Sequence, residues 1–263
     1  MSSIGQDLKY DDSTASELFH ENSKQQRSDY RMVERIIAMI TNPLLQKMAE
    51  SRKRYPAARK VSLPKDLPKA KISFDEVVLS RRSTRNYTGE SIPFAEICKI
   101  LYFANGVTGS VEAHDGLQQL FRAAPSGGAL YPVEIYLFAF QIKKLEPGVY
   151  HYDPVENVLE YVAEGDYRPA LITTTFTEEL ASAGAVIALT GISIKNRVKY
   201  AERGYRFMLM EAGHIAQNIL LCATSLQLGA FPIGGFIDDE MDTLLGIDGL
   251  DEVSLYLIAL GRV

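Results

Sequence analysis

The longest regular pattern in the sequence is an apolar helix that runs roughly from Ala201 to Leu228. It lies between two strand-like runs, GAVIALTGI and EVSLYLIAL. Further strand-like runs precede it at VEIYLFAF and at GVYHYD, which pairs with VLEYV through the turn DPVEN. Strands and helices in this order predict an α+β fold in which helices cover a sheet, without an internal repeat.

The residues before this region have a different character. They are polar and hold one amphipathic stretch with helical spacing, MVERIIAMITNPLLQKMA. They end in YPAARKVSLPKDLPKAK, whose three prolines predict an extended, irregular connection. We therefore expect an N-terminal helical extension over residues 1–70 and one domain over residues 71–263.

Two further helices are predicted at the start of that domain. Ser73 and Glu76 form the pattern of a capping box for a short helix, FDEVVLS. A second helix is expected to begin after Ser91 and to end at Asn105 and Gly106, a pair that readily takes the left-handed stop conformation.

Composition excludes several classes of function. The 263 residues are 46% hydrophobic and carry a formal net charge of -5, so we expect a globular chain without a general basic surface for nucleic acid. No apolar stretch is long enough to cross a bilayer, and the N-terminus has no export signal. We expect a cytoplasmic protein with no membrane or nucleic-acid partner, in which Cys98 and Cys222 are reduced, buried thiols.

The common catalytic signatures are missing from the sequence. It contains no Rossmann glycine fingerprint, no P-loop, no zinc-protease motif and no nucleophile elbow. The four histidines are scattered and never paired at ligand spacing, so no metal site is expected.

One candidate site is the segment SRRSTRNY. Arg81, Arg82 and Arg85 surround Ser83 directly after a predicted helix. Guanidinium groups bind phosphate in a bidentate manner, and the hydroxyl adds a further hydrogen bond. The alternative is a solvated basic turn.

Glycine pairs mark two other candidates. Ser126, Gly127 and Gly128 remove side-chain bulk where the chain enters a strand, which allows backbone amides to approach a flat or charged ligand. An ordinary tight turn is the alternative. The second pair, Gly234 and Gly235, precedes acidic residues that suit the start of a helix.

The long helix carries a polar stripe and follows a basic segment. Glu211, His214, Gln217 and Asn218 recur at spacings of three and four, which indicates either satisfied core hydrogen bonds or contacts to a polar ligand.

The basic segment, KNRVKYAERGYRF, contains five basic residues and one acidic residue. It reads either as a cationic surface loop between a strand and a helix or as a site in which cations favour the phenolate of Tyr200, as a tyrosine base requires. Lys199 and Tyr200 diverge by about 100° on a regular helix, so they can converge on one reactant only where the backbone is irregular.

Together these motifs resemble the flavin-dependent nitroreductase-like superfamily, and more closely its SagB-type branch, the dehydrogenases that oxidise azoline rings in thiazole- and oxazole-modified peptides. The matching segments follow the family's order over nearly the whole chain: FHENSK, RRSTRNYTGESIP, RAAPSGGALYPVEIY, PGVYHYDP, KYAERGYRFMLMEAGHIAQN, PIGGF and ALGR. The resemblance implies a helix-covered mixed or antiparallel sheet in an intertwined homodimer, with one FMN at each end of the interface.

The resemblance also implies a role for each matching residue. The phosphate and ribityl oxygens of FMN would be held by Arg81, Arg82, Ser83 and Arg85. The isoalloxazine would lie against the loop of Pro125, Ser126, Gly127, Gly128, Ala129 and Leu130. The pocket would be completed by Gln217, Gly234, Gly235 and Arg262. The catalytic pair of the branch matches Lys199 and Tyr200.

The implied reaction is a dehydrogenation. FMN accepts a hydride from the azoline ring, the Lys-Tyr pair takes the acidic ring proton, and oxygen reoxidises the flavin. We expect a precursor peptide as substrate. A cyclodehydratase complex is an expected partner, because the residues ahead of the flavin motifs look too short and polar for a separate leader-peptide-binding domain. The alternatives are an NAD(P)H-dependent nitroreductase or quinone reductase, and a non-catalytic flavin-binding subunit of a peptide-modifying complex.

Overall fold

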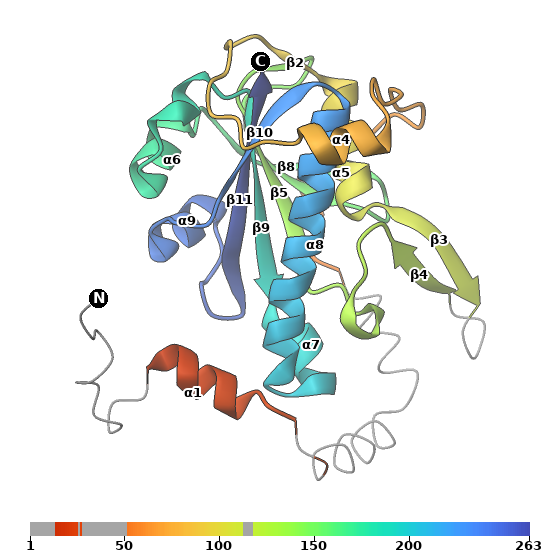
Figure 1. The fold of residues 1–263 in the computed structure, drawn as a ribbon, viewed down its shortest axis with the longest axis vertical. Coiled ribbons are helices and arrows are strands. Elements are labelled where there is room, and N and C mark those ends of the chain that lie inside the picture. Colours follow the sequence, from red (N-terminus) through yellow and green to blue (C-terminus); the bar gives the residue numbers. More distant parts are fainter. Residues whose placement is uncertain (1–13, 26, 28–51, 113–117) are drawn as a thin grey trace.

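A seven-stranded sheet forms the centre of the fold (Figure 1). The computed structural model describes residues 14–25, 27, 52–112 and 118–263, so the amphipathic stretch predicted within residues 32–49 lies outside the described residues. All neighbouring strands are antiparallel. Their spatial order is β1 (Arg59–Ser62), β8 (Val158–Glu164), β7 (Gly148–Asp153), β5 (Val133–Ala139), β9 (Ala185–Ile192), β11 (Glu252–Arg262) and β10 (Leu228–Ile233).

Helices cover both faces of this sheet. On one face, alternate residues of β5 pack with α5 (Phe94–Asn105) and α8 (Arg203–Ser225). On the other face, Tyr136 and Phe138 of β5 pack with α6 (Arg168–Thr175), η3 (Glu178–Ser182) and α9 (Asp238–Leu245). Because both faces are covered, β5 is buried along its whole length, which explains its almost uninterrupted apolar run. The α+β fold predicted from the sequence is confirmed.

The remaining elements lie around these layers. Two small sheets pair β2 (Ile92–Pro93) with β6 (Ile142–Lys143) and β3 (Val107–Glu112) with β4 (Gln118–Arg122). The short helices are α1 (Ala15–Asn22), α4 (Phe74–Ser80), α7 (Ser193–Tyr200) and the 3₁₀ turn η2 (Gly127–Ala129). α1 packs on the start of α8, where Phe19 meets Tyr205 edge to face and Arg206 donates a 2.7 Å hydrogen bond to Ser23 Oγ.

Several local predictions are confirmed. Ser73 and Glu76 form the capping box of α4, with the Ser73 amide donating to Glu76 Oε2 at 2.8 Å. β7 and β8 form the predicted hairpin. α9 begins with three acidic residues in its first turn.

Three predictions are corrected. The sequence predicted a left-handed conformation at the helix end, but Gly106 is extended (φ -66°, ψ 158°). A glycine is needed there for space, because a Cβ atom would lie 2.5 Å from the Tyr102 ring. Residues 59–62 lie in the connection expected to be irregular, but they form an edge strand that pairs with β8. Their backbone groups complete the hydrogen-bond ladder, and the prolines of the connection lie outside the strand. The helix expected over 201–228 is α8, Arg203–Ser225, and a separate helix, α7, precedes it.

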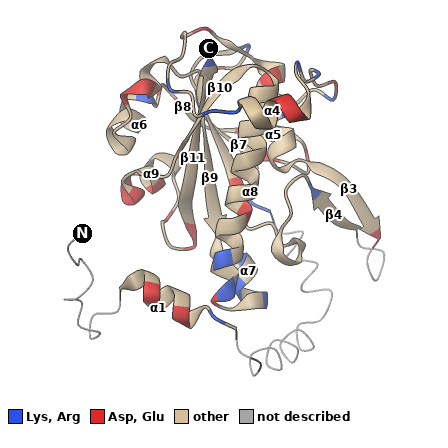
Figure 2. Cartoon of the chain, in the orientation of Figure 1, with Lys and Arg blue, Asp and Glu red and all other residues tan. Residues whose placement is uncertain are grey.

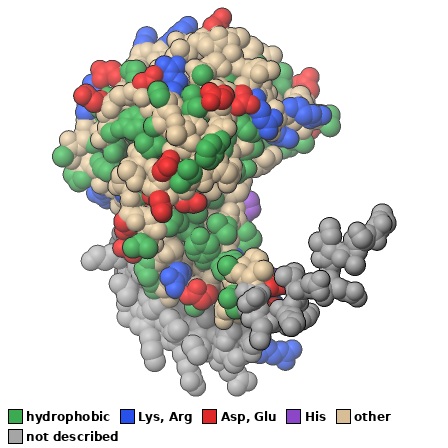
Figure 3. Space-filling view, turned by 90° about the vertical axis from the view of Figure 1, so that its left-hand side faces the viewer, with side chains coloured by type: hydrophobic (Ala, Val, Ile, Leu, Met, Phe, Trp, Pro, Cys, Tyr) green, Lys and Arg blue, Asp and Glu red, His purple; other side chains and the backbone are tan. Residues whose placement is uncertain are grey.

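Both cysteines and the surface fit the composition. Cys98 and Cys222 are buried thiols, and burial raises the pKa of Cys98 to about 12 and that of Cys222 to about 11. Among the described helices, none has the length and apolarity that crossing a membrane requires. On the side that carries α6 and α9, acidic, basic and hydrophobic side chains are interspersed (Figure 3). The division of the chain at residue 70 stays a prediction.

Candidate functional site

The residues predicted to form one site lie in two groups on this chain. The first group, which we call the loop group, consists of loop 125–130 with Lys199 and Tyr200; Phe207 at the N-terminal end of α8 packs on it. The second, the arginine group, consists of residues 81–85 with Arg262, and it lies beyond the C-terminal end of α8. The helix from Phe207 to Ser225 spans roughly 27 Å. Figure 1 shows η2 beside α7 and, toward the other end of α8, α4, which leads into residues 81–85.

The loop group is built on a sharp turn. Gly128 (φ 67°) and Ala129 (φ 53°) both lie in the left-handed region. The Tyr131 amide donates a 2.9 Å hydrogen bond to Ser126 Oγ, which closes the turn. A Cβ on Gly128 would lie 2.6 Å from Tyr200 Oη and 2.9 Å from the Nζ atom of the neighbouring lysine. The missing side chain therefore lets a phenol and an ammonium group reach the same point of the loop.

The end of α7 brings Lys199 and Tyr200 together. α7 ends at Tyr200, so both residues belong to its last turn, and Ala201 follows with φ 48° and ψ -137°. The Tyr200 ring packs edge to face on Phe207, with centroids 4.9 Å apart. Lys199 Nζ lies 5.4 Å from the centroid of the Tyr200 ring. Lys199 and Tyr200 therefore converge on the loop although both belong to the helix, and the irregular residue, Ala201, follows the pair.

The basic residues of α7 do not form a cationic surface loop, so that interpretation is wrong. They belong to a helix, as the blue segments of the α7 ribbon in Figure 2 show. Two of them are neutralised: Lys195 is buried and bonds Glu134 at 3.0 Å, and Arg197 bonds Glu202 at 2.6 Å. Within the described part of the chain, Lys199 has no carboxylate partner.

The arginine group lies where α4 meets the edge of the sheet. Ser83 bridges to Ala230 of β10, and Arg85 stacks on Phe231 with its guanidinium carbon 4.0 Å from the ring centroid. Arg82 donates only to backbone carbonyls. No carboxylate of the described residues pairs with the guanidinium groups of residues 81, 82 and 85. The segment therefore holds three uncompensated cations at one edge of the sheet.

Arg262 of the arginine group and the remaining predicted pocket residues are spread along the molecule. Arg262 ends β11 with its guanidinium 3.8 Å from Glu96. Gly234 and Gly235 follow β10 and are exposed, and a Cβ on Gly235 would meet no atom within 4 Å. Gln217 is exposed in the second half of α8. The structure does not bring these residues into contact with the loop group of the same chain.

The residues of the polar stripe of α8 lie in different environments. His214 and Gln217 are exposed, whereas Glu211 is 1% exposed and lies one turn beyond Phe207. Neither carboxyl oxygen of Glu211 has a hydrogen-bond partner among the described residues. Burial raises the pKa of Glu211 to about 7, and the hydroxyl of Ser126 is the strongest of the groups that limit the rise. A protonatable acid therefore lies behind the glycine loop.

Sequence reasoning missed a set of charged side chains buried in the sheet. Glu134, His151 and Glu160 lie on adjacent strands and are at most 2% exposed. The available signal was a charged residue inside the apolar runs VEIYLFAF, GVYHYD and VLEYV. Within the described residues, no group of acids, histidines and cysteines has the arrangement of a metal site.

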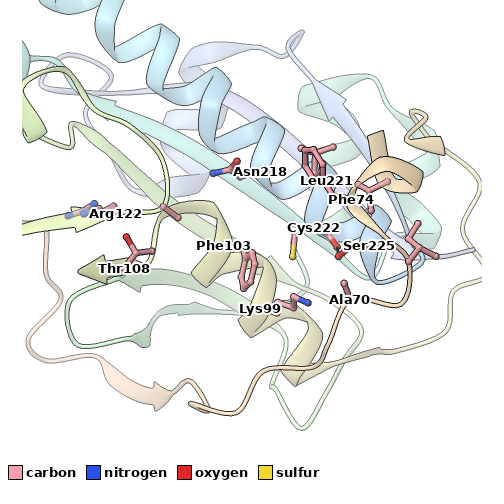
Figure 4. Close-up of a pocket in the computed structure, with 13 residues that line it drawn as sticks. Ala70, Phe74, Lys99, Phe103, Thr108, Arg122, Asn218, Leu221, Cys222 and Ser225 are labelled. Carbon is pink, nitrogen blue, oxygen red and sulfur yellow. Dashed lines mark hydrogen bonds between the residues drawn. The ribbon is translucent and has the colours of Figure 1, made fainter. Parts of the chain in front are cut away.

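One groove in the described part of the chain lies away from the Lys-Tyr pair. It has a volume of about 520 Å³ and opens between α4, α5 and α8. Phe74 and Leu221 line one part of it, and Phe103 and Lys99 line another (Figure 4). Its lining combines apolar side chains with polar ones, among them Arg122 and Asn218.

The comparisons with known proteins match this architecture. Residues 78–262 match the nitroreductase family. The chain belongs to that family. A protein of Methanocaldococcus jannaschii named "putative nitroreductase" is 31% identical over 192 residues, which cover 73% of this chain and 91% of the relative.

Other relatives carry the names of peptide-processing proteins. The trifolitoxin operon protein TfxC of Rhizobium leguminosarum is 27% identical, with coverage of 81% of this chain and 61% of the relative. The microcin B17-processing protein McbC of Escherichia coli is 33% identical, with coverage of 48% and 49%. The chain therefore spans about half to three-fifths of the length of these two relatives.

Solved structures support the nitroreductase-like fold. One from Anabaena variabilis, with the same description as the archaeal relative, gives a TM-score of 0.65 at 28% identity and covers 80% of this chain and 43% of that one. A chain of the Escherichia coli microcin synthetase McbBCD complex with truncated pro-MccB17 bound gives 0.60 at 22% identity, covering 92% and 99%. At that identity the likeness establishes the fold alone.

Membership of this family gives the chain FMN as its cofactor. The residues present fit this group. The guanidinium groups of residues 81, 82 and 85, which pair with no carboxylate of the described residues, suit a phosphate. The glycine loop leaves backbone uncovered beside the phenol and the ammonium, as a flat ring needs.

Proposed function

We propose that this protein is an FMN-dependent dehydrogenase that oxidises azoline rings to thiazoles or oxazoles in ribosomally made peptides. The observation that carries the proposal is the convergence of Tyr200 Oη and Lys199 Nζ on Gly128, within 3 Å of the position of a Cβ atom there. A base beside the flavin loop suits a substrate that loses a proton together with a hydride. The similarity to TfxC and McbC supports a peptide as the substrate.

The chain's own residues would handle the proton. An azoline has an acidic C–H between its imine and its carbonyl group, and Tyr200, as the phenolate, would take that proton on Oη. The ammonium group of Lys199 would stabilise the phenolate before the transfer. Bound FMN would supply the acceptor for the hydride that leaves the adjacent ring carbon. The ring loses the two hydrogens and gains one double bond, and oxygen would accept the electrons in the end.

The cofactor would be held by both groups of residues. The phosphate and ribityl oxygens would bind the arginine group, and the ring would lie on the glycine loop, with Gly234, Gly235 and Gln217 completing the pocket. Since the two groups lie at opposite ends of α8 on one chain, we propose a homodimer in which the arginine group of one protomer meets the loop group of its partner. A precursor peptide and a cyclodehydratase complex would be the further partners.

The decisive experiment measures azoline oxidation by the FMN-loaded protein, followed by mass spectrometry of an azoline peptide. We expect Tyr200→Phe and Lys199→Ala to keep the flavin spectrum while the rate falls by roughly 100-fold or more, the scale for loss of a general base. Tyr205→Phe is the matched control, because this tyrosine lies near α7 but packs on Phe19. An unchanged rate in Tyr200→Phe would refute the proposed mechanism.

A second candidate is an NAD(P)H-dependent nitroreductase or quinone reductase. The archaeal relative, of which the alignment covers 91%, favours it. Rapid, saturable bleaching of the flavin by NADPH, without a response to azoline peptides, would establish this activity instead. Bound FMN with no turnover of either substrate would indicate a non-catalytic subunit of a peptide-modifying complex.

A further inference from the structure

A row of buried charges runs across the sheet to α7. Glu160 Oε2 lies 3.0 Å from His151 Nδ1, and His151 Nε2 lies 3.2 Å from Glu134 Oε2. Glu134 Oε1 accepts a 3.0 Å hydrogen bond from Lys195 Nζ. Lys195 is 6% exposed, and the three sheet residues are at most 2% exposed. We call these four residues the charge row.

The chemistry of the charge row requires that its members be ionised together. Each ring nitrogen of His151 faces a carboxylate oxygen, and only the imidazolium can donate to both. The two carboxylates, Glu134 and Glu160, are then balanced by His151 and Lys195. A buried ion that loses its partner is strongly unfavourable, so the row fixes the position of every member.

Lys195 joins this rigid row to both parts of the loop group. Its Nζ atom also donates to the backbone carbonyl of Tyr131, the residue that closes the glycine turn, at 3.3 Å. Lys195 lies one helical turn before Lys199 on α7. One ammonium group therefore holds the helix that carries the pair and the loop that the pair approaches.

Few interactions within α7 itself stabilise this helix. It is eight residues long, it lacks a side-chain N-cap, and it ends at the left-handed Ala201. Helices of this length are marginal without tertiary contacts. Besides Lys195, the buried anchor of α7 is Asn196, whose amide lies 3.5 Å from the Gly204 carbonyl.

We propose that Lys195 is a positioning residue, which fixes α7 on the charge row so that Lys199 and Tyr200 meet the glycine loop at Gly128. The consequence for catalysis rests on the proposed function. The role of Lys195 in the placement of α7 does not, because it rests on the contacts of Lys195 with Glu134 and with the Tyr131 carbonyl.

The test compares four variants by two measurements. The variants are Lys195→Met, Glu134→Gln, the double variant that carries both changes, and Arg197→Met. Arg197→Met is the matched control, since it removes one cation from the same helix at an exposed ion pair. The first measurement is hydrogen exchange of the amides of residues 193–200 relative to those of α8. The second is the rate of azoline oxidation at saturating substrate, together with the Kd of FMN.

We expect faster exchange in α7 and a rate loss on the order of 100-fold in Lys195→Met, the scale of an ångström-sized displacement of a reacting group. The Kd of FMN and the substrate concentration for half-saturation should stay within about twofold, and Arg197→Met should behave as the unchanged protein. The double variant removes the unpaired carboxylate, so global stability should recover while the rate and the exchange of α7 do not.

Three outcomes would overturn the proposal. The first is normal hydrogen exchange in α7 of the double variant. The second is a rate of azoline oxidation that recovers in the double variant along with its stability. The third is an effect of Arg197→Met as large as that of Lys195→Met. If Lys195→Met does not fold, the double variant supplies the same comparison. If the unchanged protein binds FMN but does not oxidise azolines, the proposed function fails, and the exchange measurement alone still decides the role of Lys195.

Discussion

Glu211 shows how the fold controls the charge of a single residue. The carboxyl lies behind the glycine loop, and burial raises its pKa from 4.5 to about 7. The positive charges of Arg122 and Lys195 act in the opposite direction and lower this pKa. The spacing of the polar stripe identified this residue, but spacing alone could not tell that Glu211 is buried while His214, on the next turn, is exposed. That difference depends on which face of α8 the loop and the sheet cover.

The raised pKa of Glu211 predicts a dependence of stability on pH. Between pH 4.5 and about 7 the folded protein retains a proton that the unfolded chain has lost, so the stabilising contribution is complete below pH 4.5 and is lost as the pH rises to about 7. The loss amounts to about 3 kcal/mol. We expect urea unfolding of Glu211→Gln to show a flatter pH profile in this window, with Glu90→Gln, on the surface, as control.

His151 acts with the same sign but at higher pH. Although burial opposes its charge, the carboxylates of Glu134 and Glu160 raise its pKa above 6.5. Its contribution is complete below pH 6.5 and is lost as the pH rises through the folded value. His151 and the carboxyls whose pKa is lowered change the stability of Glu211→Gln and of the unchanged protein alike, so the difference between their slopes between pH 4.5 and 6.5 reports Glu211. An equal slope in Glu211→Gln and in the unchanged protein would show that this carboxyl does not titrate in that window.

At the scale of elements, local signals predicted what local interactions determine. The capping box of α4 and the hairpin of β7 and β8 follow from neighbouring residues, and both are confirmed. α7 could not be predicted, because it is short and its decisive contact joins Lys195 to Glu134, 61 residues earlier in the chain. β1 was missed for a similar reason: its four residues pair with β8 through backbone groups that carry no sequence signal.

The meeting of two elements at Gly128 gives a prediction at this scale. A Cβ at this position would strain a backbone with φ 67° and would clash with Tyr200 Oη and Lys199 Nζ, at 2.6 and 2.9 Å. We expect Gly128→Ala to displace the end of α7 and to lower azoline oxidation on the order of 100-fold. Gly109→Ala in β3 is the control, since its nearest contact would be Phe121 at 4.0 Å. Full activity in Gly128→Ala would mean that the pair does not work at this loop.

At the scale of the whole molecule, the sequence motifs predict which residues form the site, but they do not predict how these residues are divided between copies of the chain. Motif order carries no information on which copy of the chain contributes each residue. In the structure the arginine group and the loop group lie at opposite ends of α8. Several apolar side chains are exposed on the helices near both groups: Phe74, Val78 and Leu79 on α4, and Leu209 and Met210 on α8. Exposed apolar patches of this kind mark interfaces, which favours a site completed by a second protomer.

The division of each site between two protomers can be tested by mixing two inactive variants. One variant, Arg81→Ala with Arg85→Ala, loses the phosphate side of the site, and the other, Tyr200→Phe, loses the base. If each site takes the arginine group from one protomer and the loop group from its partner, a mixed dimer contains one site with both defects and one intact site. Random exchange after mild unfolding and refolding with FMN should then restore about a quarter of the activity of the unchanged protein. If both groups of a site came from one chain, no mixed dimer would contain an intact site, and the mixture would stay as inactive as its components. Refolding each variant alone is the control, and sedimentation of the mixture verifies that dimers have formed.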